Sequence, residues 1–251
     1  ELDGVRDHGQ VPRLFIASLP RDIRKIAQAS QRKIVFIKSI LPLILHANEL
    51  ILEDRDRLQR LHQQIGLGVE LTAEDEAWLA LMADNYGLDK ADTAALLKRV
   101  DVIPPSLAIA QAAEESGWGT SRFAHEGNAL FGQRAYKPGK KGIVPKERED
   151  GKTYKVRAFD HLMDGVKAYV HNLNSHFAYA KFRQMRARMR ESSGSIEGYR
   201  LVGALERYSE RGADYIKTIR TIMRVNSLQV FDRAKLGGQV VATDETFNPD
   251  A

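Results

Sequence analysis

Apolar side chains recur at helical spacing along most of the chain. Between residues 18 and 66 they return every three or four positions, which predicts helix, and Pro42 is expected to bend or divide this stretch into a packed helical pair. Thr72 followed by Asp75 matches a helix-capping pair, and Gly87 is expected to end the helix that it opens. Ser106 and Asp160 are expected to cap two later helices. The helical patterns after Gly87 cover residues 93–100, 107–116, 160–173, 179–189, 196–208 and 214–231.

Residues 137–157 depart from the helical pattern. Glycine and proline recur in them, and polar and apolar positions alternate around 153–159, which predicts a hairpin or small sheet. This is the only convincing β signal in the sequence. Residues 236–251 carry two adjacent glycines, three acids and no base, and are expected to form a poorly ordered tail. The chain is therefore expected to be α+β, mostly helical with one small β region.

Composition excludes several classes of protein. With 251 residues, 43% of them apolar, the chain is long enough to bury a sizeable core, and the absence of cysteine rules out disulfides, thiolate metal sites and cysteine nucleophiles. The net charge of +5 favours an anionic partner, which leaves nucleic acid, an anionic membrane surface or an anionic polymer. The longest apolar stretch, residues 34–45, is interrupted by Lys38 and Pro42, so no transmembrane helix is expected.

The strongest chemical signal lies at the end of the predicted helix 107–116. This helix is alanine-rich and apolar nearly all round, which is typical of a buried helix, and its last turn carries Glu114 and Glu115. Adjacent helical residues point about 100° apart, so the two acids are expected to have different roles. The helix dipole and partial burial both raise a carboxyl pKa there, as a general acid for glycosidic cleavage requires. The residues alone favour the simpler alternative, in which both acids are solvated or paired with Arg122 or another base.

A longer motif identifies the kind of protein. The segment AQAAEESGWGTS at residues 110–121, followed by NALFG at 128–132, resembles the glucosaminidase domain of glycoside hydrolase family 73 and, within it, the Bax proteins of Gram-negative bacteria. The resemblance covers about residues 12–230. It implies a lysozyme-like fold, with a helical lobe and a small β-lobe around a substrate groove. Further similarity lies in residues 99–104 and 169–176 and at 208–209.

The resemblance also implies an activity and a division of the chain. The expected function is hydrolysis of the β-1,4 bond after N-acetylglucosamine in peptidoglycan glycan strands, without cofactor or metal. Such an enzyme acts outside the cytoplasm, in the bacterial periplasm, and the start at Glu1 rather than Met leaves room for a removed signal or anchor. The expected parts are an N-terminal helical accessory segment (1–70), a catalytic domain (71–235) and a flexible acidic tail (236–251).

Three residues receive catalytic roles from the family pattern. The acid directly before Ser-Gly-Trp-Gly is Glu115, which would protonate the leaving glycosidic oxygen. Glu114 is expected to have a structural role only. Glu147 matches a second acidic residue of many family members and would activate a water. Tyr208 matches a tyrosine near the groove and would position the N-acetyl group or a water, unless it is a core residue at a helix end. In the second role, Glu147 has three alternatives: Glu149, Asp150 or the N-acetyl group of the substrate itself.

Five more residues are candidates for binding sugar. An aromatic ring suits a sugar face, and an amide can hydrogen-bond hydroxyl or acetamide groups. For Phe131 and Tyr215 core packing is an equal or better interpretation, and Asn128 can equally hold a turn. The candidates are Trp118, Asn128, Phe131, Gln133 and Tyr215.

Other chemistries find little support. His161, His171 and His176 are spaced by ten and five residues, which does not match a zinc helix, and neither a nucleophile elbow nor a Gly-rich phosphate loop occurs. Residues 181–190 hold five bases and no acid, as a helix that contacts nucleic acid does. Because apolar residues 182, 185 and 189 form one stripe, the bases are expected to be a solvated rim, and nucleic acid is not expected as a partner.

Two functional alternatives stay close to the family. One is a non-catalytic module that binds the cell wall through the same groove. The other is a muramidase or lytic transglycosylase cut, after N-acetylmuramic acid. Residues 137–157 hold eight bases and three acids, and this local charge of +5 would suit the carboxylates of muramyl peptides. Lys140, Lys141 and Lys146 are the candidate contacts.

Overall fold

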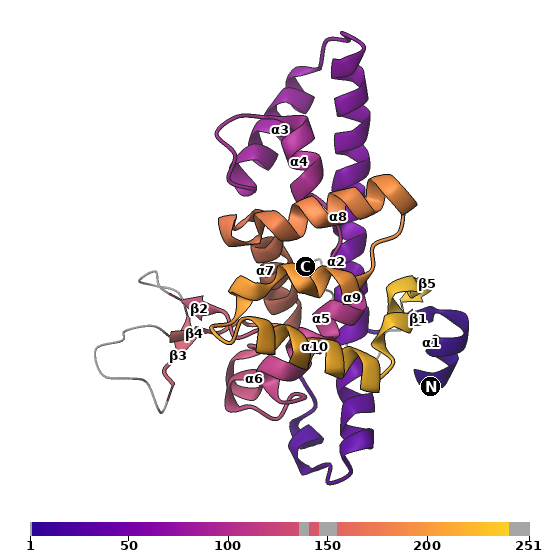
Figure 1. The fold of residues 1–251 in the computed structure, drawn as a ribbon, viewed down its shortest axis with the longest axis vertical. Coiled ribbons are helices and arrows are strands. Elements are labelled where there is room, and N and C mark those ends of the chain that lie inside the picture. Colours follow the sequence, from indigo (N-terminus) through magenta and orange to yellow (C-terminus); the bar gives the residue numbers. More distant parts are fainter. Residues whose placement is uncertain (1, 136–140, 146–154, 241–251) are drawn as a thin grey trace.

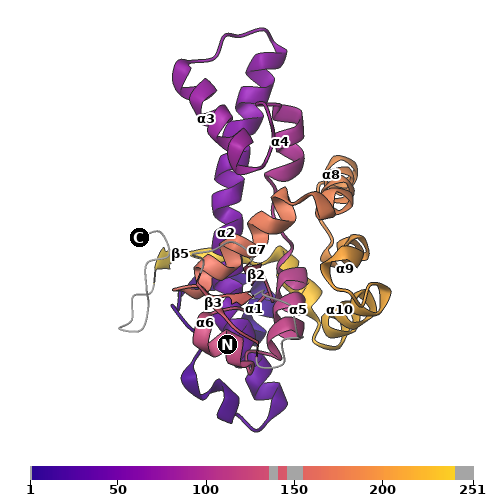
Figure 2. The same cartoon turned by 90° about the vertical axis from the view of Figure 1, so that its left-hand side faces the viewer.

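The computed structural model describes residues 2–135, 141–145 and 155–240, which fold into a mostly helical protein with two small sheets (Figures 1 and 2). This confirms the predicted α+β class and lysozyme-like organisation. The α-helices are α1 (Leu2–His8), α2 (Ala29–Gly66), α3 (Ala73–Asn85), α4 (Thr93–Arg99), α5 (Pro105–Ser116), α6 (Arg122–Gly127), α7 (Leu162–Ser175), α8 (Ala180–Ser193), α9 (Gly198–Leu201) and α10 (Ala213–Val225). The 3-10 helices are η1 (Arg21–Lys25), η2 (Phe177–Tyr179), η3 (Val202–Ala204), η4 (Glu206–Tyr208) and η5 (Leu228–Arg233).

The long helix α2 runs along the length of the molecule (Figure 1). Its 38 residues span about 57 Å at 1.5 Å per residue. The predicted helical pair is wrong, because α2 passes through Pro42 without interruption. Proline removes one backbone hydrogen bond, but the neighbouring Leu41 and Leu43 are 1% and 0% exposed, so burial offsets that loss.

By length and composition α2 would also be able to cross a membrane, contrary to the expectation from Lys38 and Pro42. Its most apolar 18-residue window has a mean hydropathy of 1.7, and 67% of that window is buried inside the protein. Burial of this kind is what the core helix of a folded protein shows.

Two hydrophobic cores divide α2 between them. Its first part packs with α5 and α7 in the main core, whereas Leu58 and Leu61 belong to a smaller core with α3 and α4. This second core forms an arm at one end of the molecule (Figures 1 and 2). The packing of this smaller core therefore runs across the predicted boundary between the accessory segment (1–70) and the catalytic domain (71–235).

The small β-lobe is an antiparallel sheet of three short strands in the order β2-β4-β3. Its strands are β2 (Arg134–Ala135), β3 (Gly142–Ile143) and β4 (Lys155–Arg157). β3 and β4 lie within the predicted β region 137–157, whereas β2 lies just before it. A second sheet was not predicted: β1 (Gln10–Arg13) pairs in parallel with β5 (Lys235–Val240). The expectation of a poorly ordered tail is wrong for residues 236–240, because Leu236 pairs with Val11 and is only 9% exposed.

Two of the predicted helices are shorter than their sequence patterns. The pattern at 196–208 becomes α9, η3 and η4, and the pattern at 214–231 divides into α10 and η5. Ser227, between the last two, has a left-handed backbone with φ 49°, which ends a helix. Thr72 caps α3 as predicted, with its hydroxyl accepting from Asp75 N at 3.2 Å, whereas α7 is capped by His161 rather than Asp160.

The basic helix α8 is the clearest departure from expectation. The expectation that the bases of this helix form a solvated rim is wrong for Arg183 and Arg186, which are 5% and 0% exposed. The Arg186 guanidinium donates to the backbone oxygens of Lys98, Arg99, Asp101 and Val102, at 2.9–3.2 Å. These carbonyls lie at and just beyond the end of α4, where a helix leaves acceptors without partners. The bases of α8 that are buried therefore serve the fold.

Candidate active site

Glu115 stands at the end of the most buried helix of the protein's main core. Every residue of α5 except Glu114 and Glu115 is buried, and α5 packs against α2, α10 and η5. Gly117, with φ 59°, ends the helix in the left-handed conformation that glycine favours. The fold therefore carries both acids to the place where the apolar helix first meets solvent.

The two adjacent glutamates have different surroundings, as the sequence predicts. Glu114 Oε1 pairs with Arg211 Nη1 at 2.6 Å, so its base is Arg211 and not Arg122, which pairs with Glu126. Burial raises the pKa of the Glu115 carboxyl to about 7, and the nearby charge of Glu114 adds to this effect. A hydrogen bond from the Tyr215 hydroxyl and the charge of Arg211 act in the opposite direction. Glu115 can thus keep its proton at a much higher pH than an ordinary glutamate does.

Gly132 forms one wall against the Glu115 carboxyl. A Cβ placed on Gly132 would lie 2.7 Å from Glu115 Oε2, closer than real Cβ atoms come to any neighbour. Gly132 also has φ +62°, a conformation that strains other residues. The two sequence motifs, ESGWG and NALFG, therefore meet at this contact.

Four tyrosines form one cluster of rings beside the same carboxyl. Tyr208 stacks on Tyr215 with ring centroids 5.6 Å apart and planes at 12°, and its hydroxyl donates to Phe131 O at 3.0 Å. Tyr169 and Tyr179 contact Tyr208 at 6.5 and 6.0 Å between centroids. Burial raises the pKa of Tyr208 far above its usual value, so its hydroxyl stays protonated. Tyr208 therefore lies within the predicted neighbourhood of Glu115.

A buried amide joins this cluster, and the sequence analysis missed it. Gln111 is 0% exposed and lies one turn before Glu115 on the same face of α5. Its Oε1 accepts from the Tyr169 hydroxyl at 2.7 Å, and its Nε2 donates to the Tyr215 oxygen at 2.9 Å. The sequence does contain one signal for it, a single polar residue among alanines on a helix expected to be buried. A buried amide is nearly always hydrogen-bonded, so such a glutamine is expected to have partners.

The aromatic residues that were predicted to line the groove pack against other parts of the protein. Phe131 is 3% exposed and stacked on Tyr169 at 3.9 Å, and Tyr215 is 1% exposed, so these rings pack in the core and have no free face for a sugar. Trp118 is partly exposed, but its ring lies against α2: Lys33 Nζ is 4.9 Å from the ring centroid, and Phe36 meets its edge.

The two predicted amides differ from each other. Asn128 caps α6 with a left-handed backbone, and its Nδ2 donates to Phe159 O and Asp160 O, which supports the alternative that it holds a turn. Gln133 follows Gly132, and its backbone oxygen accepts from Arg157 N, which ties it to β4. Its buried Oε1 has no hydrogen-bond partner among the residues that the structure describes.

Several candidates lie outside the described residues. These are Glu147, Glu149, Asp150, Lys140 and Lys146. Lys141 is described, and its Nζ pairs with Asp160 Oδ1 at 2.6 Å on the surface. Within the described ranges, no group of three or more histidine, aspartate or glutamate side chains could hold a metal ion.

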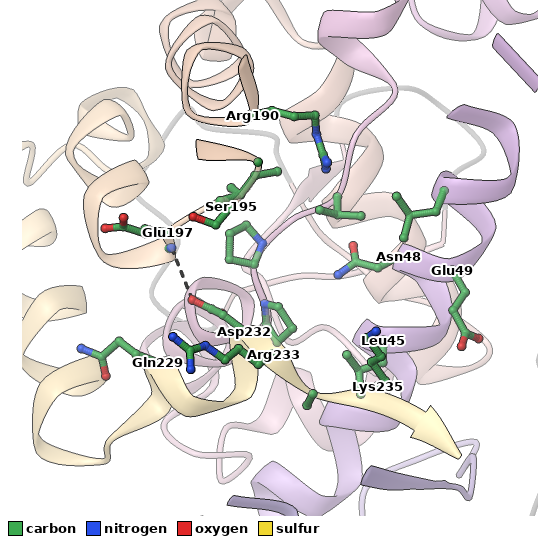
Figure 3. A pocket seen from close by; sticks show the side chains of 18 of the residues that line it. Leu45, Asn48, Glu49, Arg190, Ser195, Glu197, Gln229, Asp232, Arg233 and Lys235 are labelled. Atoms are coloured by element: carbon green, nitrogen blue, oxygen red, sulfur yellow. Dashed lines mark hydrogen bonds between the residues drawn. The ribbon is translucent and has the colours of Figure 1, made fainter. Parts of the chain in front are cut away.

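A cavity of about 980 Å³ opens at the other end of α5 (Figure 3). Arg190, Glu197 and Asp232 are among its lining residues, but none of the predicted site residues is. Asp232 accepts from the backbone N and from the Oγ of Ser106, each at 2.8 Å, so the cap of α5 comes from a residue 126 positions away. The predicted Ser106 cap is therefore wrong, and α5 begins at Pro105.

Comparison with known proteins is consistent with this geometry. A family model described as glucosaminidase, mannosyl-glycoprotein endo-β-N-acetylglucosaminidase, matches residues 90–228. The protein named Bax from Escherichia coli (strain K12) is 34% identical over 205 residues, which is 79% of this chain and 71% of that protein. No solved structure was found to match the chain.

Proposed function

The chain belongs to the glucosaminidase family of glycoside hydrolases, and from this premise we propose that it cleaves peptidoglycan glycan strands after N-acetylglucosamine, with Glu115 as the general acid. The observation that carries the proposal is the raised pKa of the Glu115 carboxyl. Burial holds the pKa of Glu115 near 7 while the helix end presents it at the surface. Hydrolysis of a glycoside needs a carboxylic acid that still has its proton near neutral pH.

The proposed chemistry follows from that proton. Glu115 gives it to the glycosidic oxygen as the bond from that oxygen to the anomeric carbon breaks, and water adds to the anomeric carbon. Glu147 takes the proton of this water in the proposed scheme, as the second carboxylate of an inverting glycosidase does, and then releases that proton to solvent. Afterwards Glu115 regains a proton from solvent. The net change is the addition of one water across one glycosidic bond.

Three further residues have proposed contacts with the substrate. Tyr208 lies beside Tyr215, and its hydroxyl donates to Phe131 O, so we assign it the positioning of the N-acetyl group or a water through the lone pairs of that hydroxyl. Gln133 follows the glycine that touches Glu115, and we propose that its amide contacts a sugar hydroxyl or the acetamide group once the side chain turns outward. Trp118 is proposed to contact the glycan only at the edge of the site, because its ring packs against α2.

The partner and the place of action follow from the same proposal. Peptidoglycan lies outside the cytoplasm, so the protein acts there, in the periplasm of a bacterium. The anionic partner favoured by the net charge is then the carboxylates of the muramyl peptides. Nucleic acid is not proposed, since Arg183, Arg186 and Arg190 of α8 bond to the protein itself.

The decisive variant for catalysis is Glu115→Gln. Purified sacculi incubated with the wild-type protein should release soluble muropeptides, and Glu115→Gln should reduce the rate by a factor of about 100 or more. Glu114→Gln is the matched control, because its carboxylate pairs with Arg211 on the surface, and it should stay within a few-fold of wild type. Equal release by wild type and Glu115→Gln would contradict the catalytic role of Glu115, and no release by either protein would support the non-catalytic wall-binding module.

A further inference from the structure

We propose that Gln111 is a positioning residue for the general acid, through a one-way chain of hydrogen bonds that runs from Tyr169 to Gln111, then to Tyr215 and then to Glu115. The inference rests on the proposed role of Glu115 and adds a residue that touches neither the substrate nor the reacting atoms. The chain joins three helices, because Tyr169 belongs to α7, Gln111 to α5 and Tyr215 to α10.

The direction of the chain follows from the orientation of the Gln111 amide. The Tyr169 hydroxyl donates to Gln111 Oε1 at 2.7 Å, and burial raises the pKa of Tyr169 far above its usual value, so this donor keeps its proton. An amide has its acceptor on one side and its donors on the other. With Oε1 turned toward Tyr169, Gln111 must turn Nε2 toward Tyr215, which it meets at 2.9 Å.

This orientation decides what Tyr215 offers to Glu115. The Tyr215 oxygen already accepts from Gln111, so its own proton is free to point at the carboxyl, and the hydrogen bond between Tyr215 and Glu115 has this sense. A reversed amide would take the Tyr215 proton for Oε1 and would leave a lone pair facing Glu115. Gln111 therefore selects the donor state of Tyr215.

The chain serves both halves of the acid's cycle. While Glu115 is protonated, Tyr215 occupies one carboxyl oxygen as a donor, so the acidic proton sits on the other oxygen. After the proton has left for the glycosidic oxygen, the same hydroxyl stabilises the new carboxylate, and donors in series strengthen one another. Gln111 is 0% exposed, so water cannot replace it.

The test is the titration of Glu115 in variants that break the chain without changing its shape. Gln111→Met keeps the length of the side chain and removes both its donor and its acceptor, whereas Tyr215→Phe removes the last donor. We expect the Glu115 pKa, followed by 13C NMR of the carboxyl, to rise above the wild-type value by about half a unit to one unit in Tyr215→Phe. In Gln111→Met it should rise by less, because Tyr215 still donates to Glu115 but without the support of the amide. Tyr179→Phe is the control: its ring lies in the same cluster, but its hydroxyl bonds to Asn172, and the pKa should not move.

A second measurement separates positioning from stability. With dye-labelled sacculi, Gln111→Met should lower kcat about tenfold with little change in KM, while the alkaline limb of the rate profile moves to higher pH. Disruption of the fold would lower kcat without moving that limb upward. Tyr169→Phe removes one oxygen at the far end of the chain, so it is the variant to use if Gln111→Met unfolds, and it should give a smaller shift in the same direction.

The outcomes distinguish this inference from the proposed function. An unchanged Glu115 pKa in Gln111→Met, Tyr169→Phe and Tyr215→Phe would overturn the chain, even if all three variants lose activity. A wild-type protein that releases nothing from sacculi would overturn the proposed function, and the NMR titration would still decide whether the chain exists.

Discussion

Gly132 and Glu115 are in contact across the candidate site, with so little space between them that a single Cβ on Gly132 would lie 2.7 Å from Glu115 Oε2. The two residues are 17 positions apart and belong to two different motifs. Their contact explains why a glycine stands at this point: any side chain there would push the carboxyl away from its partners.

The first prediction concerns that contact. Gly132→Ala should displace the Glu115 carboxyl and lower kcat on sacculi at least tenfold, because a small misplacement of a catalytic group is costly. It should also destabilise the protein by about 1 kcal/mol, since alanine is strained at φ +62°. Muropeptide release and urea unfolding measure the two effects.

Gly87→Ala is the control that separates the effect of backbone strain from the effect of displacing the Glu115 carboxyl. Gly87 has φ +67°, but a Cβ there would meet nothing within 4 Å. It should show a similar loss of stability and keep wild-type kcat. If Gly132→Ala also kept full activity, the contact with Glu115 would have no catalytic importance.

The second prediction links the pKa of Glu115 to stability. The pKa rises from 4.5 in the unfolded chain to about 7 in the folded protein, so the folded state binds the proton more tightly. Stability from this group is therefore fully present below about pH 4.5 and is lost as the pH rises through 7. Replacing the carboxyl by a neutral amide should stabilise the protein at pH 8, by at most about 3 kcal/mol, and have little effect at pH 4.

Urea unfolding of Glu115→Gln at pH 4 and pH 8 measures this difference. Glu114→Gln should not stabilise at either pH, because it removes an exposed ion pair with Arg211 that contributes less than about 1 kcal/mol. A Glu115→Gln variant that is no more stable than wild type at pH 8 would mean that the carboxyl is ionised without cost and is not held as an acid.

Sequence reasoning predicted local features well and distant partnerships poorly. The different directions of the adjacent side chains of Glu114 and Glu115 and the Thr72 cap depend on residues within one helical turn. Gln111 was missed because its partners Tyr169 and Tyr215 are 58 and 104 positions away. Helix periodicity gives the face on which a glutamine lies, but not which hydroxyls the fold brings to that face.

The same limit explains the errors in the fold. The pairing of Val11 with Leu236 joins opposite ends of the chain, so the local sequence pattern does not predict either strand. Pro42 was expected to divide a helix, yet the packing of its neighbours is worth more than one backbone hydrogen bond. In both cases tertiary burial overrides local propensity.

The third prediction concerns the basic helix α8. Arg186 is fully buried and bonded to four backbone carbonyls, so Arg186→Met should destabilise the protein by about 3 kcal/mol or more. Arg188, two positions further along the same helix, is exposed, and Arg188→Met should stay within about 0.5 kcal/mol. Urea unfolding of the two variants provides the comparison, and equal stability would mean that the buried contacts of Arg186 contribute nothing.

The fourth prediction concerns the second carboxylate. Glu147→Gln should lower kcat on sacculi by a factor of about 100 or more, the usual effect of losing a general base. Glu149→Gln and Asp150→Asn carry the same change in charge within the same segment and should stay near wild type. If one of these two were the inactive variant, the role would pass to that residue, and if all three were active, the N-acetyl group of the substrate would supply the second function.

The most direct test of the central claim is mass spectrometry of the reducing ends that the protein creates in sacculi. Products reduced with borohydride should carry N-acetylglucosaminitol at the new ends with the wild-type protein, and no such ends should form with Glu115→Gln. Reduced or anhydro-muramic ends would contradict the proposed bond, and N-acetylglucosaminitol ends formed equally by both proteins would contradict the role of Glu115.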